Sequence, residues 1–149
     1  MDMHGSPPSR NALLVSEIMS SPVKTCPLDV TAGSAAEQMR SQGLMHVVVV
    51  DASGRIAGVL SDRDLRSAQP SAVLVKDSSL REKALSLLKV KDVMSSDAQT
   101  VRPNQTVRAA LALMKRHKVG SVPVVDDDGR PVGIVTHADV IEMALGLLR

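Results

Sequence analysis

The stretch VPVVDDDGRPVGIVT, residues 122–136, decides the fold of this 149-residue chain. It consists of two runs rich in β-branched residues on either side of an Asp-x-x-Gly turn, which is the pattern of a tight β-hairpin. A second stretch with the same pattern, VVVVDASGRIAGVLS, occupies residues 47–61, 75 positions earlier. The two hairpins therefore indicate a repeated unit, and the alignment can be extended outward from them.

The repeat covers most of the chain. At the constant shift of 75, residues 15–65 align with residues 90–140 without a gap. Identical residues include Met-Ser-Ser at 19–21 and 94–96, Thr25 and Thr100, and the closing Asp64 and Asp139. Internal repeats determine architecture, so the chain is interpreted as a duplicated unit of about 50 residues.

Each unit has the same expected order of elements. A short helix at 16–19 or 91–94 leads to an extended piece, a helix with apolar residues at helical spacing, the hairpin and a final helix. The expected motif is β-α-β-β-α, so the fold class is α/β (α+β). The strands are apolar at nearly every position, which predicts sheets covered on both faces. Because a unit of this size buries little surface alone, two tandem motifs are expected to pack with pseudo-twofold symmetry.

The repeat also sets the expected domain borders. Residues 1–11 are interpreted as a flexible N-terminal tail, 12–68 as the first motif and 90–149 as the second. Residues 69–89 form a connector with a helix, whose start is predicted from a capping box at Ser79 to Glu82. The apolar face expected for that helix consists of Leu80, Ala84, Leu87 and Leu88.

The composition excludes several functions. The chain has no Phe, Trp or Tyr, so it offers no platform on which nucleic-acid bases could stack, and a net charge of +2 is too small to indicate a nucleic-acid partner. No apolar run approaches the length of a membrane span. The single cysteine fits a reducing compartment, and we expect a cytoplasmic protein. The four histidines lack metal spacing, so we expect no metal site and no cofactor.

The repeated pattern resembles the CBS domain, and the whole chain resembles a CBS domain pair, or Bateman module. The matching features are the opening Val-x-x-Ile/Val-Met at 15–19 and 90–94, the hairpin at 122–136, and the closing Gly-h-x-Ser/Thr-x-x-Asp at 58–64 and 133–139, where h is apolar. Arg63-Asp64-Leu65-Arg66 running into a Pro-Ser connector also looks like stand-alone bacterial pairs of the acetoin-utilisation type. The first copy departs from the pattern, because Val48 stands where the second copy has Pro123.

The closing motif contains the candidate ligand-binding groups. A strand ends there, a hydroxyl residue turns the chain and a helix begins, so free amides at the helix start could bind a phosphate. The hydroxyl of Ser61 or Thr136 could bind the same anion or a sugar oxygen, and Asp64 or Asp139 could accept both hydroxyls of a ribose. Ser/Thr-x-x-Asp is also an ordinary helix cap, however, and capping alone stays open as an explanation.

An adenine base would have to lie on aliphatic side chains, since the chain has no aromatic ring. The candidates are Val23, Val48 and Val59 in the first copy and Ala98, Pro123 and Ile134 in the second. Further candidates, each with solvent exposure or core packing as the alternative, are Thr25, Thr100, His46, Ser121, Arg63 and His137.

The resemblance implies AMP, ADP, ATP, S-adenosylmethionine or a related adenosyl ligand in the cleft between the motifs. We therefore expect a non-catalytic regulatory module whose shape or dimer packing depends on an adenine nucleotide, together with a regulated protein that the sequence does not identify. The alternative is a structural dimerisation or partner-binding module with vacant sites. An enzyme is disfavoured, because no nucleophile–base pair stands out. The apolar residues of 140–148 predict a homodimer.

Overall fold

The computed structural model describes residues 12–148, and the tail predicted for residues 1–11 lies outside them. The chain forms two compact units. Unit 1 contains the described residues up to Pro22, residues 99–127 and those from Val132 onward, whereas unit 2 contains residues 23–98 and 128–131. Neither unit is a single continuous segment of the chain.

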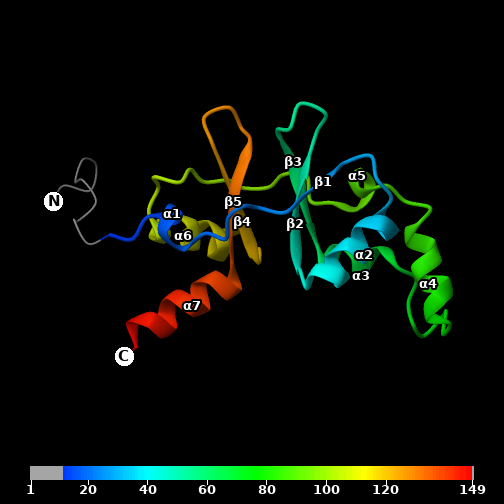
Figure 1. Ribbon diagram of the computed structural model, residues 1–149. Coiled ribbons are helices and arrows are strands. Elements are labelled where there is room, and N and C mark those ends of the chain that lie inside the picture. Colours follow the sequence, from blue (N-terminus) through cyan, green and yellow to red (C-terminus); the bar gives the residue numbers. More distant parts are fainter. Residues whose placement is uncertain (1–11, 149) are drawn as a thin grey trace. The chain divides into compact units, whose positions relative to one another are not determined.

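Unit 2 contains the first β-α-β-β-α motif, as predicted. Its elements are β1 (Thr25–Pro27), α2 (Ala32–Gln42), β2 (His46–Val50), β3 (Ile56–Ser61) and α3 (Asp62–Ala68), followed by α4 (Ser78–Leu85) and α5 (Val90–Val93) (Figure 1). The sheet has the order β1-β2-β3, with β1 parallel and β3 antiparallel to β2.

Unit 1 contains the second motif in a reduced form. Its elements are α1 (Val15–Ile18), α6 (Val107–His117), β4 (Ser121–Val125), β5 (Pro131–Thr136) and α7 (His137–Leu147). The equivalent of β1 is a single parallel bridge between Val101 and Val124, which corresponds by the shift of 75 to the pairing of Cys26 with Val49.

Two prolines explain the shorter pairing in unit 1. In unit 2, the amide of Val48 donates to the Lys24 carbonyl at 3.1 Å and the amide of Leu28 donates to the Val50 carbonyl at 3.2 Å. The equivalent positions in the second copy are Pro123 and Pro103, which have no N–H to donate. The ladder therefore keeps only the bonds that involve the Val101 backbone.

The opening segment of each copy completes the other copy. In unit 1, Ser20 and Ile134 exchange two backbone hydrogen bonds of 2.9 and 3.1 Å. In unit 2, Ser95 and Val59 exchange two backbone hydrogen bonds of 2.9 and 3.0 Å. Residues 15–20, which belong to the first copy in sequence, thus form an edge of the second copy, and residues 90–95 do the converse.

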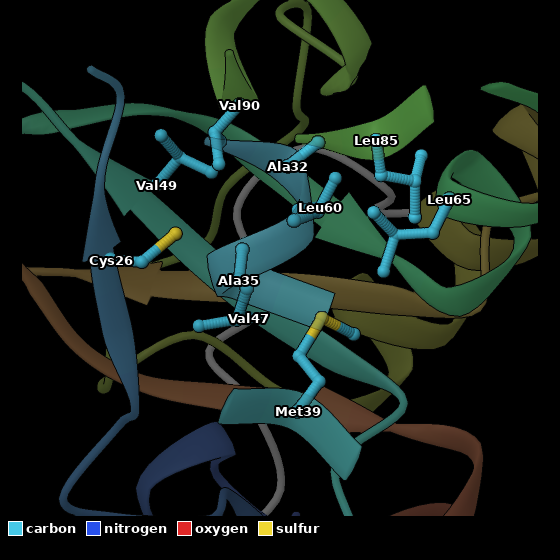
Figure 2. Packing of buried hydrophobic residues seen from close by; sticks show 10 residues of the cluster. All are labelled: Cys26, Ala32, Ala35, Met39, Val47, Val49, Leu60, Leu65, Leu85 and Val90. Carbon is cyan, nitrogen blue, oxygen red and sulfur yellow. The ribbon is translucent and has the colours of Figure 1, made fainter. Parts of the chain in front are cut away.

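Each unit has its own aliphatic core, as the lack of aromatic residues requires. In unit 2, the core lies between one face of the sheet and the helices α2 and α3, and it also includes Leu85 and Val90 (Figure 2). The core of unit 1 includes Val15, which is the repeat equivalent of Val90. The exchanged segments therefore contribute one fully buried valine to each core.

The connector helix α4 differs from its prediction. Its N-cap is Asp77, whose carboxylate accepts the amide of Ser79 at 2.9 Å, and this bond lowers the pKa of Asp77. The helix starts earlier than the expected box at Ser79, and its buried residue is Leu85. The expected face was wrong because Leu80 and Leu87 are exposed.

Across residues 12–148, helices are too short or too polar to cross a membrane.

Candidate functional site

The candidate site in unit 1 lies where β5 ends and α7 begins. Thr136 is the N-cap of α7, and its hydroxyl oxygen accepts the amide of Asp139 at 3.4 Å. In return, Oδ2 of Asp139 accepts the amide of Thr136 at 2.8 Å and the hydroxyl of Thr136 at 3.1 Å. The capping interpretation of this motif is therefore confirmed, and it accounts for one oxygen of the carboxylate.

The second oxygen of Asp139 faces a residue that sequence reasoning missed. Its Oδ1 atom accepts a hydrogen bond of 2.8 Å from the hydroxyl of Ser20. Ser20 belongs to the segment that pairs with β5 at Ile134. The only sequence signal was the identity of Ser20 with Ser95 in the repeat. The alignment placed both residues in their own copies, far from the acid that each contacts.

Unit 2 repeats this arrangement, with a longer contact between the serine of the exchanged segment and the carboxylate. Ser61 caps α3, its hydroxyl accepting the amide of Asp64 at 3.1 Å, and Oδ2 of Asp64 accepts the amide of Ser61 at 2.8 Å. The hydroxyl of Ser95 approaches Oδ1 of Asp64 at 3.4 Å. Helix α3 has seven residues, whereas α7 has eleven.

The sheet register brings several predicted residues of the first copy together. Thr25 pairs with Val48, Val48 pairs with Val59, and His46 pairs with Ser61. Side chains alternate along a strand, and directly paired residues share a face. The five residues therefore lie on the sheet face opposite to Val47, Val49 and Leu60, which point into the helix-covered core.

The second copy repeats this division of faces. Val122, Val124 and Val135 belong to the core of unit 1. The alternate positions on β4 and β5 are Ser121, Pro123, Ile134 and Thr136. Ser121, Pro123 and Ile134 are buried and Thr136 is half-buried, so this face is also covered.

The remaining candidates lie at the margins. Arg63 and His137 are exposed in the first turns of α3 and α7, and Val23 is half-buried just before β1. Thr100 is half-buried beside the Val101 bridge in unit 1. Ala98 is the last residue of the long segment of unit 2, so it belongs to a different unit from the second-copy residues with which it was grouped.

A cavity of about 430 Å³ lies elsewhere in unit 2. It is lined by residues from the end of α2 and from α3, among them Met39, Arg40, Leu65 and Arg66. None of the predicted site residues lines it. In the described part of the chain, no three His, Cys, Asp or Glu side chains are grouped so that they could hold a metal ion.

Comparisons with known proteins agree with the repeat. The CBS domain family matches residues 15–71 and 90–146. A CBS domain-containing protein of Dictyostelium discoideum is 33% identical over 136 residues, which cover 91% of this chain and 94% of that protein. The chain also matches larger enzymes, two homoserine O-acetyltransferases among them, and covers 23% and 25% of their length.

Solved structures show the same architecture. A Vibrio cholerae protein assigned to acetoin utilization (AcuB) has a TM-score of 0.74 and 30% identity, with 92% of this chain and 93% of that chain covered. CBSX2, solved in complex with AMP, has a TM-score of 0.72 and 26% identity, with 92% and 99% covered.

Proposed function

The chain belongs to the CBS domain family as two tandem copies, and we propose that it is a regulatory module that binds an adenosine-containing ligand. A CBS domain pair is a regulatory module rather than a catalytic one. The observation that carries the proposal is the arrangement at the end of one sheet in each copy. There the aliphatic side chains and the hydroxyl of one sheet face meet the carboxylate in the first turn of the following helix.

The carboxylates suit a ribose. In each copy, Oδ2 of the aspartate is occupied by its own helix cap, while Oδ1 receives only a serine hydroxyl from the exchanged segment. A carboxylate oxygen accepts more than one hydrogen bond, and ribose hydroxyls are donors. We therefore assign Asp64 and Asp139 to the sugar, and the hydroxyls of Ser61 and Thr136 to the sugar or the phosphate.

The base would lie on aliphatic side chains. Val48 and Val59 are paired neighbours on the predicted site face, with Thr25 next to Val48. Pro123 and Ile134 hold the equivalent positions in the second copy. Adenine gains from burial against such side chains without stacking on a ring. The AMP bound to CBSX2 supports AMP as the first ligand to test, with ADP, ATP and S-adenosylmethionine following.

Equilibrium dialysis tests the proposal directly. The protein has no Trp, Tyr or Phe, so the near-ultraviolet absorbance of adenine reports bound ligand with little background. We expect AMP or S-adenosylmethionine to be retained and GMP to be retained more weakly. A ligand at about 100 times its Kd should also raise the free energy of unfolding by about 2.7 kcal/mol, measured by thermal unfolding.

The variant Asp139→Asn tests the site. It keeps an oxygen for the helix cap but removes the charge, so affinity at that site should fall at least about tenfold. The matched control is Asp127→Ala, which removes an exposed carboxylate paired with Arg102 in the same unit. Equal loss in both variants would contradict the assignment, and retention of none of the four adenosyl ligands would contradict the proposed function.

A structural module with vacant sites is the second candidate. Two observations favour it: the capping boxes alone explain the repeated spacing of Ser61 and Thr136 with their acids, and α7 has no buried residue. A module of this kind would form a stable homodimer, yet none of the adenosyl ligands would change its unfolding temperature.

A further inference from the structure

We propose that Ser20 acts as an internal competitor at the Asp139 site, holding the carboxylate oxygen that a ribose hydroxyl would take. The inference rests on the proposed function and deepens it, because it names a residue that sets the affinity of the site. Ser20 belongs by sequence to the first repeat and Asp139 to the second. Each repeat therefore limits ligand binding at the site of the other repeat.

The geometry supports a direct competition. The Ser20 hydroxyl donates to Oδ1 of Asp139 at 2.8 Å, the usual length of a strong O–H···O bond. The other oxygen of Asp139 already accepts two donors from Thr136. A ligand hydroxyl that approaches this carboxylate must therefore replace Ser20 or share Oδ1 with it.

The Ser20 hydroxyl can leave the Asp139 carboxylate while the backbone of its segment stays folded. Two backbone hydrogen bonds to Ile134 hold Ser20 against β5, and the amide of Val15 donates to the Gln105 carbonyl at 2.8 Å. The side chain of Ser20 is exposed, so a rotation about χ1 moves the hydroxyl from the carboxylate into water. When a ligand hydroxyl replaces Ser20 at Oδ1, the cost of its entry is one hydrogen bond to a charged acceptor, and the fold of the segment is unaffected.

Unit 2 provides an internal comparison. Ser95 occupies the equivalent position, but its hydroxyl lies 3.4 Å from Oδ1 of Asp64. A bond of that length is weak. The competitor is therefore stronger at Asp139 than at Asp64, and ligand is expected to occupy the Asp64 site at lower concentration.

The experiment measures AMP affinity by equilibrium dialysis at one site at a time. The Asp64→Asn background isolates the Asp139 site, and the Asp139→Asn background isolates the Asp64 site. In the first background, Ser20→Ala should raise AMP affinity about 10- to 150-fold, the range of one hydrogen bond to a charged group. In the second, Ser95→Ala should raise it less than about 3-fold.

Matched controls separate competition from disturbed structure. Ser21→Ala removes the neighbouring hydroxyl, which donates to the Val132 carbonyl at 3.1 Å, and should leave AMP affinity unchanged. Ser96→Ala is the corresponding control in the other copy. Ser20→Thr keeps a hydroxyl and should restore the affinity of the parent protein, while far-UV circular dichroism confirms folding.

The outcomes are distinct. Unchanged affinity in Ser20→Ala would overturn the competition and leave the proposed function intact. Reduced affinity would show that Ser20 contacts the ligand, which also overturns it. Absence of AMP binding in every protein, the unsubstituted chain included, would contradict AMP as the ligand and the competition at this site together.

Discussion

At the scale of single residues, Gly58 and Gly133 are equivalent in the repeat but face different atoms. A Cβ on Gly58 would lie 2.5 Å from the backbone oxygen of Ser95, which is fixed by pairing with Val59. A Cβ on Gly133 would lie 2.5 Å from Sδ of Met19, the end of a flexible side chain, and 3.2 Å from the Ser20 oxygen. The exchanged segments thus require glycine more strictly in the first copy.

Alanine substitutions should show this difference. Gly58→Ala should lower the free energy of unfolding by about 1–3 kcal/mol, because backbone must shift. Gly133→Ala should cost less, because the Met19 side chain can move. Urea unfolding followed by circular dichroism measures both. The control is Gly146→Ala in α7, where a Cβ meets no atom within 4 Å, and it should stabilise by up to about 1 kcal/mol. A larger loss of unfolding free energy in Gly133→Ala than in Gly58→Ala would contradict this explanation.

Cys26 makes the free energy of unfolding depend on pH in the alkaline range. Burial raises the pKa of its thiol from 9.0 to about 11. Between these values the unfolded chain loses the thiol proton while the folded chain retains it, so the free energy of unfolding falls as pH rises from 9 towards 11. The contribution is fully present below pH 9, and its loss should reach about 2–3 kcal/mol.

The measurement is urea unfolding between pH 8 and 11 for the native chain and for Cys26→Ala. Lysines titrate in the same range in both proteins, so the difference between the two slopes isolates the thiol. Parallel slopes would show that Cys26 ionises equally easily in the folded state.

At the scale of elements, α2 and α6 end in the same left-handed backbone conformation but with different residues. Gly43 caps α2 with φ of 65°, and its repeat equivalent Lys118 caps α6 with φ of 53°. The left-handed conformation is strained for a residue with a Cβ and unstrained for glycine. The second copy therefore carries a cost at α6 that the first copy avoids at α2.

Reciprocal substitutions test this cost. Lys118→Gly should raise the free energy of unfolding by about 0.5–1 kcal/mol, and Gly43→Ala should lower it by a similar amount. Thermal unfolding by circular dichroism measures both, and Lys115→Gly, inside α6, is the control that should destabilise. Destabilisation by Lys118→Gly would mean that the lysine side chain matters more than its backbone conformation.

At the scale of the whole molecule, the exposed surface of α7 bears on assembly. Ile141, Leu145 and Leu148 follow one another at helical spacing and are 60%, 59% and 79% exposed. An apolar stripe of this kind is typical of a surface that another chain covers. None of these three side chains carries a charge. We propose a second copy of the chain as its partner.

Light scattering coupled to size-exclusion chromatography tests the homodimer. The native chain should elute with twice the mass of 15.8 kDa, and Leu145→Glu should elute as a monomer, because a buried unpaired charge would oppose association. Val73→Glu, at an exposed apolar residue outside α7, is the matched control and should stay dimeric. A monomeric native chain would contradict the homodimer.

Sequence alone indicated the duplication, the β-α-β-β-α order and the capping roles of Ser61 and Thr136, because hairpin turns, helical spacing and caps are local. It also brought the candidate hydroxyl and carboxylate of each copy to one helix start. Only the tertiary structure decided that residues 15–20 pair with the second copy and residues 90–95 with the first. It also decided that Ser20 contacts Asp139 and that Ser95 contacts Asp64. Backbone pairing between segments more than 30 residues apart leaves no local pattern, since either copy offers the same strand edge to the same motif.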